Sequence, residues 1–189
     1  SMHYYTLSKG EYDCGAVITA SHNPKQYNGF KIVIGNAHCV YGEELQKIYE
    51  LMLKQDFVQA DSPGAYREVT AIDDYVTKLH SFLNLKRPLK VIIDTGNGVG
   101  GPFMDAIFKH PMLDVEVLFQ DVDPEFPNHP ANPEKAENMQ DLSRAVVQRK
   151  ADIGIGFDAD ADRMGMVDEN GKFHGCDLLL MLLAEDFLS

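Results

Sequence analysis

Three aspartates at alternate positions are the clearest chemical feature of the sequence. Asp158, Asp160 and Asp162 directly follow the apolar run IGIGF, in the segment FDADADR. Their carboxylates converge if the loop is extended or curls around an ion, and oxygen ligands at this density suit Mg²⁺ or Ca²⁺ rather than zinc or copper. Without a cation, mutual repulsion is expected to raise the pKa of at least one carboxyl group. The segment therefore predicts a divalent-metal site.

The same aspartates also match the opening of an EF-hand calcium loop, and Glu169 falls at the twelfth position of that motif. The sixth position of an EF-hand needs glycine for a sharp turn, but this sequence has Arg163 there. The flanking runs IGIGF and MGMVD are typical of strands, whereas helices flank an EF-hand. We therefore expect a metal loop between two strands. Arg163 beside it could clamp a phosphate bidentately, or it could be an ordinary surface arginine.

A second polar loop carries a candidate nucleophile. The segment TASHNPKQYNGFKI follows the apolar run AVIT and places Ser21 and His22 beside an Asn-Pro turn. Lys31 is expected one residue inside the next strand, on the face opposite Phe30 and Ile32, so that it points away from their core. Taken singly, each of these residues has an ordinary structural explanation, because a lone serine in a turn is structural far more often than catalytic.

Taken as a block, T-A-S-H-N-P followed by Y-N-G-F-K resembles the active-site loop of the α-D-phosphohexomutases, the phosphomannomutase and phosphoglucomutase family. In that family the serine carries a phosphoryl group, and a downstream D-G-D-x-D-R loop binds Mg²⁺. Both motifs occur here in the expected order, and VIIDTGNGVGGP resembles the start of the family's second domain. The resemblance runs from about Cys14 to Leu183. One departure is Ala159, which replaces the family's usual glycine and would cost about 1 kcal/mol if that position needs a positive φ.

The resemblance implies an enzyme, an isomerase of carbohydrate metabolism. It would interconvert hexose 1-phosphate and hexose 6-phosphate, of mannose or glucose, through a phosphoserine and a bisphosphorylated sugar. The implied site residues are Ser21, His22 and Lys31 for catalysis; Ser21, Asp158, Asp160 and Asp162 for Mg²⁺; and Arg163 and Asn23 for phosphate or substrate.

Two alternatives remain open at this point. The first is a phosphoglucosamine mutase, although Y-N-G-F-K resembles the phosphomannomutase branch more. The second is a Rossmann-like, dinucleotide-binding oxidoreductase fragment. It rests on a G-x-G-x-x-G pattern at Gly96, Gly98 and Gly101, which follows the run LKVIID, with Asp121 further on. This fingerprint leaves the serine and aspartate loops unexplained.

The elements that must position these loops follow from periodicity. Strands are predicted at 16–19, 30–34, 89–93, 115–119, 153–157 and 164–167, and helices at 43–53, 72–83, 102–108, 139–147 and 178–187. The alternation predicts an α/β fold. The order strand, polar loop, strand, glycine, helix occurs twice. We therefore expect two related three-layer α/β units with mixed sheets, the first of them incomplete.

We place the domain boundary near residue 72, after a turn-rich linker at 59–66. Residues 1–72 would be the C-terminal part of the first, phosphoserine domain, and residues 73–189 the second, metal-binding domain. The proline-rich segment 121–133 is expected to be irregular and is assigned no chemistry. The family's later sugar-selecting and phosphate-binding motifs do not occur, so the isolated chain is expected to need the remaining domains of the enzyme as partners and to be inactive alone.

Composition excludes several classes of protein. There are 17 basic and 29 acidic residues, and a net charge of −12 argues against nucleic-acid and anionic-membrane surfaces. The longest apolar stretch is far short of the ~20 residues that span a bilayer. The cysteines at 14, 39 and 176 lie far apart and form no C-x-x-C pair, so neither disulfides nor a zinc site is expected. A cytoplasmic protein with reduced thiols is predicted.

Overall fold

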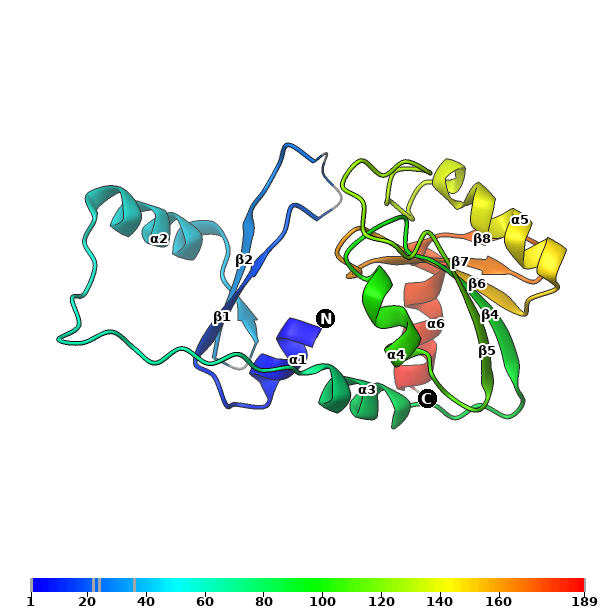
Figure 1. Cartoon of the computed structure of the whole chain (residues 1–189), viewed down its shortest axis with the longest axis horizontal. Helices are drawn as coiled ribbons and strands as arrows, with labels where there is room; N and C mark the ends of the chain where they lie inside the picture. Colours follow the sequence, from blue (N-terminus) through cyan, green and yellow to red (C-terminus); the bar gives the residue numbers. More distant parts are fainter. Residues whose placement is uncertain (1, 22, 24, 36, 189) are drawn as a thin grey trace. The chain divides into compact units, whose positions relative to one another are not determined.

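The computed structural model describes residues 2–21, 23, 25–35 and 37–188. The chain forms two compact units. One contains residues 1–19 and 29–75, and the other contains residues 20–28 and 76–189 (Figure 1). The division therefore lies inside a helix, after Tyr75. The serine loop is grouped with the second unit. The predicted boundary at residue 72 stays a prediction.

The first unit is a small antiparallel sheet with flanking helices. Its elements are α1 (Met2–Ser8), β1 (Cys14–Ile18), β2 (Phe30–Ile34), β3 (His38–Cys39), α2 (Gly42–Lys54) and α3 (Ile72–His80), of which α3 runs into the second unit. The strands are in the order β1-β2-β3, and both pairs are antiparallel. Periodicity did not predict α1 or β3, since both are too short to show a repeat.

The faces of β2 are arranged differently from the prediction. Val33 is fully buried, together with Leu7 of α1, whereas Phe30 is 66% exposed. Side chains alternate along a strand, so Lys31 lies on the same face as Val33. The expectation that Lys31 points away from the core was therefore wrong. The reason is that α1, which periodicity did not predict, packs against this face and buries it.

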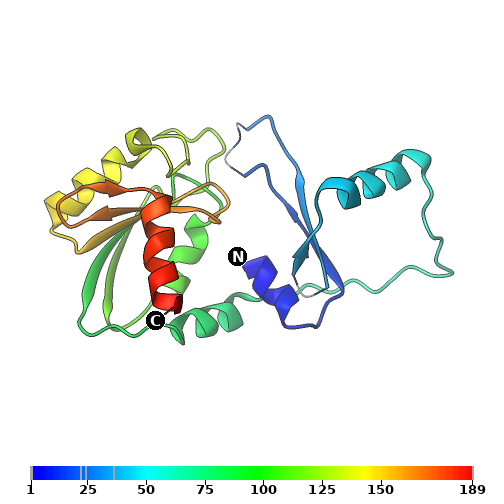
Figure 2. The ribbon, with the colours of Figure 1, turned by 180° about the vertical axis from the view of Figure 1, so that it is seen from behind.

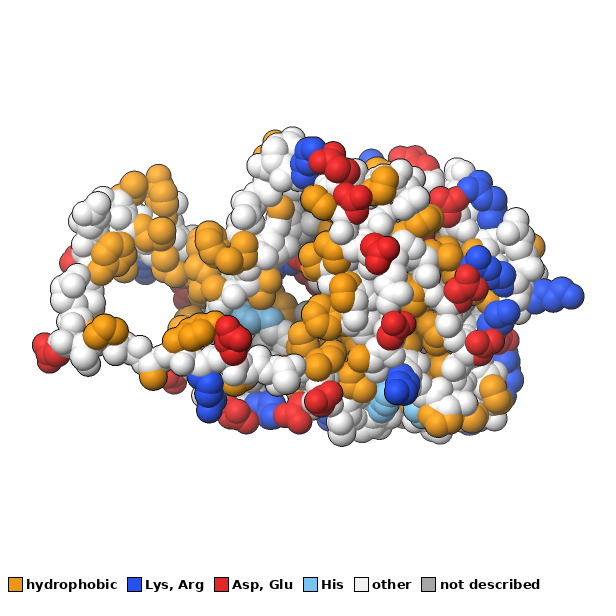
Figure 3. All heavy atoms as spheres, in the orientation of Figure 1, with side chains coloured by type: hydrophobic (Ala, Val, Ile, Leu, Met, Phe, Trp, Pro, Cys, Tyr) orange, Lys and Arg blue, Asp and Glu red, His pale blue; other side chains and the backbone are white. Residues whose placement is uncertain are grey.

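The opposite face of the sheet forms an open apolar groove with α2. Phe30 and Ile32 line it from the sheet, and Leu45, Tyr49 and Met52 line it from the helix. Within the described part of the chain, no α2 residue is buried. Hydrophobic side chains accordingly remain visible over α2 in a space-filling view (Figure 3). The amphipathic pattern predicted α2 within one residue at each end, but the apolar side of this helix is not fully buried.

The second unit is built on a five-stranded mixed sheet. Its elements are β4 (Leu89–Asp94), η1 (Gly101–Phe103), α4 (Met104–Ile107), β5 (Leu113–Leu118), η2 (Ala136–Met139), α5 (Gln140–Arg149), β6 (Ile153–Phe157), β7 (Met164–Asp168), β8 (Phe173–His174) and α6 (Cys176–Leu188). The strand order is β5-β4-β6-β7-β8. β4 pairs in parallel with β5 and β6, and the remaining pairs are antiparallel. The predicted α/β class is confirmed, and the predicted mixed sheet is found in this unit, whereas the sheet of the first unit is entirely antiparallel.

Both faces of this sheet are covered, which explains the continuous apolar run of β4. Ile92 packs with Met139, Leu142 and Val146 on the α5 side. Val91 and Ile93 point to the other side, where Met104 of α4 joins them. Figure 2 shows α5 on one face, and α4 and α6 on the other. The C-terminal ends of β4 and β6 are thus held in a rigid frame.

The predicted internal repeat is visible in the elements. The order β1, β2, β3, α2 matches β6, β7, β8, α6, and in each case the first two strands form an antiparallel hairpin. Ile18 pairs with Phe30 at the end of one hairpin, and Phe157 pairs with Met164 at the end of the other. The serine loop and the aspartate loop are therefore the tips of equivalent hairpins.

The last helix, α6, is apolar on most of its surface. Leu180, Met181 and Leu183 are more than half exposed. Among the described residues, no helix has both the length and the apolar character needed to cross a membrane. All three cysteines are free thiols, as predicted.

Candidate functional site

The aspartate loop brings its three carboxylates together. One oxygen from each of Asp158, Asp160 and Asp162 lies within 4.8 Å of the others. The loop spans only residues 158–163, because Phe157 at the end of β6 pairs with Met164 at the start of β7. Such a short loop keeps the three side chains near one another. A set of carboxylate oxygens fits Mg²⁺, and the flanking strands exclude the helix-flanked EF-hand geometry. The residues present therefore fit the metal that the sequence predicted.

Asp158 organises this loop from inside. It is 1% exposed, and its Oδ1 accepts hydrogen bonds from the backbone N–H groups of Asp162 and Arg163, each at 3.0 Å. Burial raises the pKa of Asp158, and the charges of Asp160 and Asp162 raise it further, against the opposing hydrogen bonds from Arg163. The predicted rise is confirmed, but burial and not repulsion is its largest cause.

The backbone of the loop carries its strain at an unexpected residue. Among the described residues of the loop, Ala161 has the left-handed conformation, with φ 54°. Ala159, which replaces the family's glycine, does not have a positive φ. Its alanine side chain therefore costs no left-handed strain. The positive φ lies instead at Ala161, where a non-glycine residue costs about 1 kcal/mol.

Arg163 is held beside the carboxylates by two acids. Its Nε donates to Asp158 Oδ2 at 3.0 Å, and its Nη1 donates to Glu134 Oε1 at 2.8 Å. Nη2 is buried and has no hydrogen-bond partner among the described residues. Burial alone would lower the pKa of Arg163, but the bonds to Glu134 and Asp158 raise it, so the guanidinium stays charged. It offers a cationic donor next to the aspartate loop.

The glycine-rich turn after β4 packs against this loop. A Cβ at Gly98 would lie 2.7 Å from the carbonyl oxygen of Ala159, and a Cβ at Gly101 would lie 1.9 Å from that of Gln120. Val99 N–H also donates to the Ala159 carbonyl at 2.8 Å. The glycines are thus needed for backbone packing within the protein. The space where a dinucleotide pyrophosphate would approach is filled by the chain itself, which removes the basis of the Rossmann-like alternative.

A histidine–aspartate pair, in which Asp94 is buried and His129 is partly buried, supports the same turn. His129 Nε2 lies 2.9 Å from Asp94 Oδ2, and His129 Nδ1 lies 2.9 Å from the Pro130 carbonyl oxygen. Both ring nitrogens face acceptors, which favours the doubly protonated imidazolium. Burial alone would lower the pKa of His129, but Asp94 and the Pro130 carbonyl raise it above its ordinary value. The segment 121–133, which was assigned no chemistry, therefore holds the turn that packs against the aspartate loop.

The serine loop places Ser21 in a left-handed turn. Ser21 has φ 55°, and Asn23 N–H donates to the Ala20 carbonyl at 3.1 Å. Gly29 closes the loop, because its carbonyl accepts the Thr19 N–H at 3.0 Å. Lys25 forms an ion pair with Glu125 within the second unit. His22, a predicted catalytic residue, lies outside the described residues.

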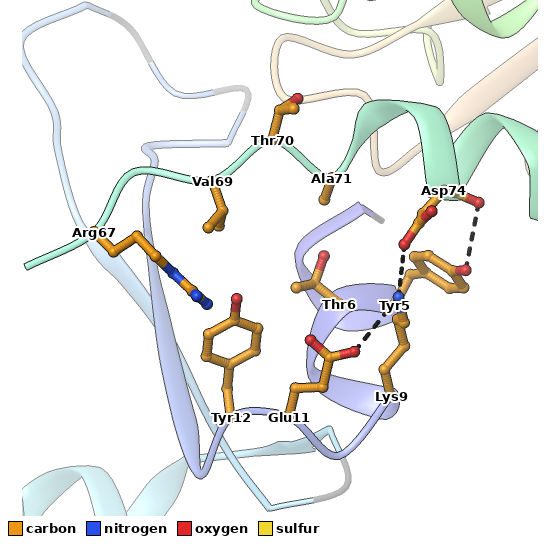
Figure 4. A pocket seen from close by; sticks show the side chains of 10 residues that line it. All are labelled: Tyr5, Thr6, Lys9, Glu11, Tyr12, Arg67, Val69, Thr70, Ala71 and Asp74. Carbon is orange, nitrogen blue, oxygen red and sulfur yellow. Dashed lines mark hydrogen bonds and ion pairs between the residues drawn. The ribbon is translucent and has the colours of Figure 1, made fainter.

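A pocket of the first unit contains none of the predicted site residues. It has a volume of about 280 Å³ and lies between α1 and residues 67–74. Lys9 pairs there with Asp74 at 2.6 Å and with Glu11 at 3.6 Å, so its charge is already balanced (Figure 4). We assign it no part in the chemistry of the two loops.

Sequence reasoning missed Glu134, His129 and Asp94. Glu134 and His129 lie in or next to the irregular segment 121–133. A polar residue at the C-terminal end of a buried parallel strand, as Asp94 is, was the signal that could have pointed to this pair. The partners of these residues are far away in the sequence, and no local pattern identifies them.

The family comparison decides the identity of this scaffold. The family domain described as "Phosphoglucomutase/phosphomannomutase, alpha/beta/alpha domain II" matches residues 72–171, more than half of the chain. The corresponding domain I matches residues 1–59. The chain belongs to the phosphoglucomutase/phosphomannomutase family. Both polar loops of this family member lie inside the matched ranges.

Individual relatives agree with this result. The chain is 43% identical over 93% of its length to a phosphoglucomutase from Neisseria meningitidis. It is 37% identical over 98% of its length to a phosphomannomutase/phosphoglucomutase from Pseudomonas aeruginosa. It spans 38% and 40% of these two proteins, respectively. The chain thus corresponds to about two fifths of the relatives' length.

Solved structures show the same fold. A phosphoglucomutase/phosphomannomutase family protein from Burkholderia thailandensis superposes with a TM-score of 0.85 and 38% identity, covering 93% of this chain and 38% of that one. A structure titled as a putative phosphomannomutase, from Thermus thermophilus, has a TM-score of 0.82 at 24% identity, over 99% of this chain and 44% of that one. The second likeness supports the fold alone.

Proposed function

We propose that this chain supplies the phosphoryl-transfer centre of a phosphohexomutase that interconverts hexose 1-phosphate and hexose 6-phosphate. The observation that carries the proposal is the convergence of three carboxylate oxygens within 4.8 Å at one hairpin tip. The equivalent hairpin presents Ser21 in a left-handed turn. A nucleophile and an acidic metal loop on two copies of one scaffold are the parts that phosphoryl transfer needs.

In the proposed reaction, Ser21 carries the transferred group. A sugar hydroxyl attacks the phosphorus, the bond from phosphorus to the serine oxygen breaks, and the serine oxygen takes up a proton. The bisphosphorylated sugar then returns its other phosphoryl group to Ser21 by the same step in reverse. Each step exchanges one phosphorus–oxygen bond for another, so no external phosphate donor is consumed once Ser21 is loaded.

Asp158, Asp160, Asp162 and an oxygen of the phosphate on Ser21 would hold Mg²⁺. Bound there, the cation would neutralise charge on the phosphoryl oxygens. Arg163 would bind phosphate through its buried Nη2, with Asn23 as a second phosphate or substrate contact. Lys31 remains our candidate for proton transfer or charge neutralisation, and His22 is a weaker one. The roles of all these residues are part of the proposal.

The names of the relatives support the proposed substrate class. Those described above are named phosphoglucomutase or phosphomannomutase/phosphoglucomutase, which favours glucose or mannose phosphates over the phosphoglucosamine alternative. Because the chain spans about two fifths of these relatives, we propose that sugar binding also uses regions equivalent to the rest of their length. The three free thiols favour a cytoplasmic site of action.

Intact-mass measurement of the purified chain tests the nucleophile. After prolonged incubation with glucose 1,6-bisphosphate and MgCl₂, we expect one added phosphoryl group, because loading Ser21 is a single transfer and does not require turnover of the sugar. The group should be absent in Ser21→Ala. Ser8→Ala, which alters another hydroxyl, should leave the phosphorylation intact. Phosphorylation that persists in Ser21→Ala would contradict the proposed nucleophile.

A further inference from the structure

The guanidinium of Arg163 has a defined orientation. Two of its three nitrogens are occupied, Nε by Asp158 and Nη1 by Glu134. The third, Nη2, is buried and lacks a partner among the described residues. A buried donor without a partner is unfavourable, because it has lost its hydrogen bonds to water and gained none in return. This cost is removed if an anionic oxygen reaches Nη2, and a phosphate is the ligand class that matches a guanidinium.

Glu134 is placed firmly enough to orient a neighbour. Its backbone N–H donates to Asn132 Oδ1 at 3.1 Å, and the Asn132 carbonyl accepts a bond from Asn138 Nδ2 at 2.8 Å. Asn138 is 6% exposed, and the adjacent Pro133 is fully buried. The backbone at Glu134 is therefore anchored on both sides, although half of its side chain is exposed to solvent.

Asp158 cannot orient the guanidinium alone. It receives one guanidinium bond, from Nε, and a single bond leaves the planar group free to rotate about that contact. Glu134 adds a second contact on a different nitrogen, from a different segment of the chain. Two contacts on two nitrogens determine the plane of the group and hence the direction of Nη2.

We propose that Glu134 is a positioning residue, which orients Arg163 so that Nη2 meets a phosphate oxygen beside the aspartate loop. The inference rests on the proposed function, because it takes the phosphate as the ligand of that loop. Glu134 directly follows the irregular segment 121–133, to which the sequence alone assigned no chemistry. Glu134 itself does not touch the phosphate.

The competing effect of Glu134 has the opposite sign. As a nearby negative charge it repels a phosphate, so simple removal of its charge would strengthen phosphate binding. Positioning predicts weaker binding when the carboxylate is lost. It also predicts rescue by glutamine, since glutamine keeps an acceptor oxygen at the same reach without the charge. The sign of the change and the rescue therefore separate the two effects.

The test measures inorganic phosphate binding to the full chain by calorimetry at saturating MgCl₂. The protein is first confirmed to be unphosphorylated by intact mass. For Glu134→Ala, we expect the dissociation constant for phosphate to rise about fivefold, a typical loss for one charge-assisted hydrogen bond. For Glu134→Gln, we expect a value within about twofold of the unaltered chain. Mg²⁺ affinity without phosphate should change by less than about twofold in both variants.

Glu137→Ala is the matched control. Glu137 is three residues away, is 72% exposed and pairs only weakly with Lys135, at 4.0 Å. Its removal should leave phosphate binding unchanged. Phosphate binding to Glu134→Ala that equals or exceeds that of the unaltered chain would overturn the inference, as would the absence of phosphate binding by the unaltered chain in the millimolar range. Failure of the unaltered chain to bind Mg²⁺ would instead contradict the proposed function.

Discussion

The two hairpins of this protein share one design and differ in how firmly their tips are held. The β6–β7 hairpin lies inside a five-stranded sheet, and its tip spans residues 158–163. The β1–β2 hairpin lies in a three-stranded sheet, and its tip spans residues 19–29. The short tip is tied by Asp158 and Arg163, whereas most described residues of the long tip are exposed.

This difference suits the two proposed tasks. A metal site needs ligands at fixed separations, and a short loop over a closed core provides them. A phosphorylated serine needs exposure, since it must present its group to a sugar. The same strand–loop–strand–helix unit can therefore serve as a rigid ligand frame or as an exposed nucleophile loop, depending on loop length and on the core beneath it.

The largest expected effect comes from removing one of the proposed metal ligands. Asp160→Asn should weaken Mg²⁺ binding by about 100-fold, because a neutral amide replaces one of three carboxylates. Calorimetric titration with MgCl₂ measures it. Asp114→Asn, on the exposed side of β5, serves as the control and should bind as the unaltered chain does. Equal Mg²⁺ affinity in both variants would show that the aspartate loop does not bind the metal.

The next effect tests how closely the glycine-rich turn beside the aspartate loop is packed. Gly101→Ala places a Cβ 1.9 Å from the Gln120 carbonyl oxygen, so it should lower the free energy of unfolding of the second unit by about 3 kcal/mol. Gly64→Ala adds a Cβ where nothing lies within 4 Å and should be nearly neutral. Urea denaturation followed by circular dichroism compares them. A small effect at Gly101 would mean that the backbone around Gln120 can move aside, and that the second unit is less rigid than proposed.

The third effect is a pH dependence of the free energy of unfolding of the second unit, which contains His129. The pKa of His129 is raised in the folded state, so the folded chain binds the imidazolium proton more tightly than the unfolded chain does. The stabilisation is therefore fully present below the ordinary histidine value of 6.5 and is lost as the pH rises through the higher folded value. Urea denaturation at pH 6 and at pH 9 should show this loss.

His129→Ala removes this pair and leaves Asp94 buried. We expect it to cost about 3 kcal/mol at pH 6 and to reduce the pH dependence between pH 6 and pH 9. His38→Ala, which alters an exposed histidine paired with Glu44 in the first unit, is the control and should keep that dependence. An unchanged pH dependence in His129→Ala would rule out the imidazolium pair as its source.

The smallest effect shows which residue of the aspartate loop carries the backbone strain. Ala161→Gly should raise the free energy of unfolding by about 0.5 kcal/mol, since glycine relieves the positive φ while losing a methyl contact. Ala159→Gly should lower it by about 0.5 kcal/mol, because glycine adds only chain entropy where φ is ordinary. The opposite signs in thermal or urea unfolding are the check. The reverse order would place the strain at Ala159.

The sequence by itself determined the family, the α/β class and the two polar loops. These follow from local information: the apolar runs of β4 and β6, the spacing of Asp158, Asp160 and Asp162, and the block around Ser21. The repeated order of hairpin and helix was also visible, because each element carries its own periodicity.

Only the tertiary structure decided which face of β2 is buried, which glycines pack against which carbonyls, and which acids hold Arg163. Lys31 was expected to point away from the core because the face opposite Phe30 was taken as the exposed one, but α1, a short helix without a visible repeat, covers that face. His129 and Glu134 find Asp94 and Arg163 across 35 and 29 residues of chain. Such contacts depend on how the segments pack together in space, and no local pattern of residues encodes that packing.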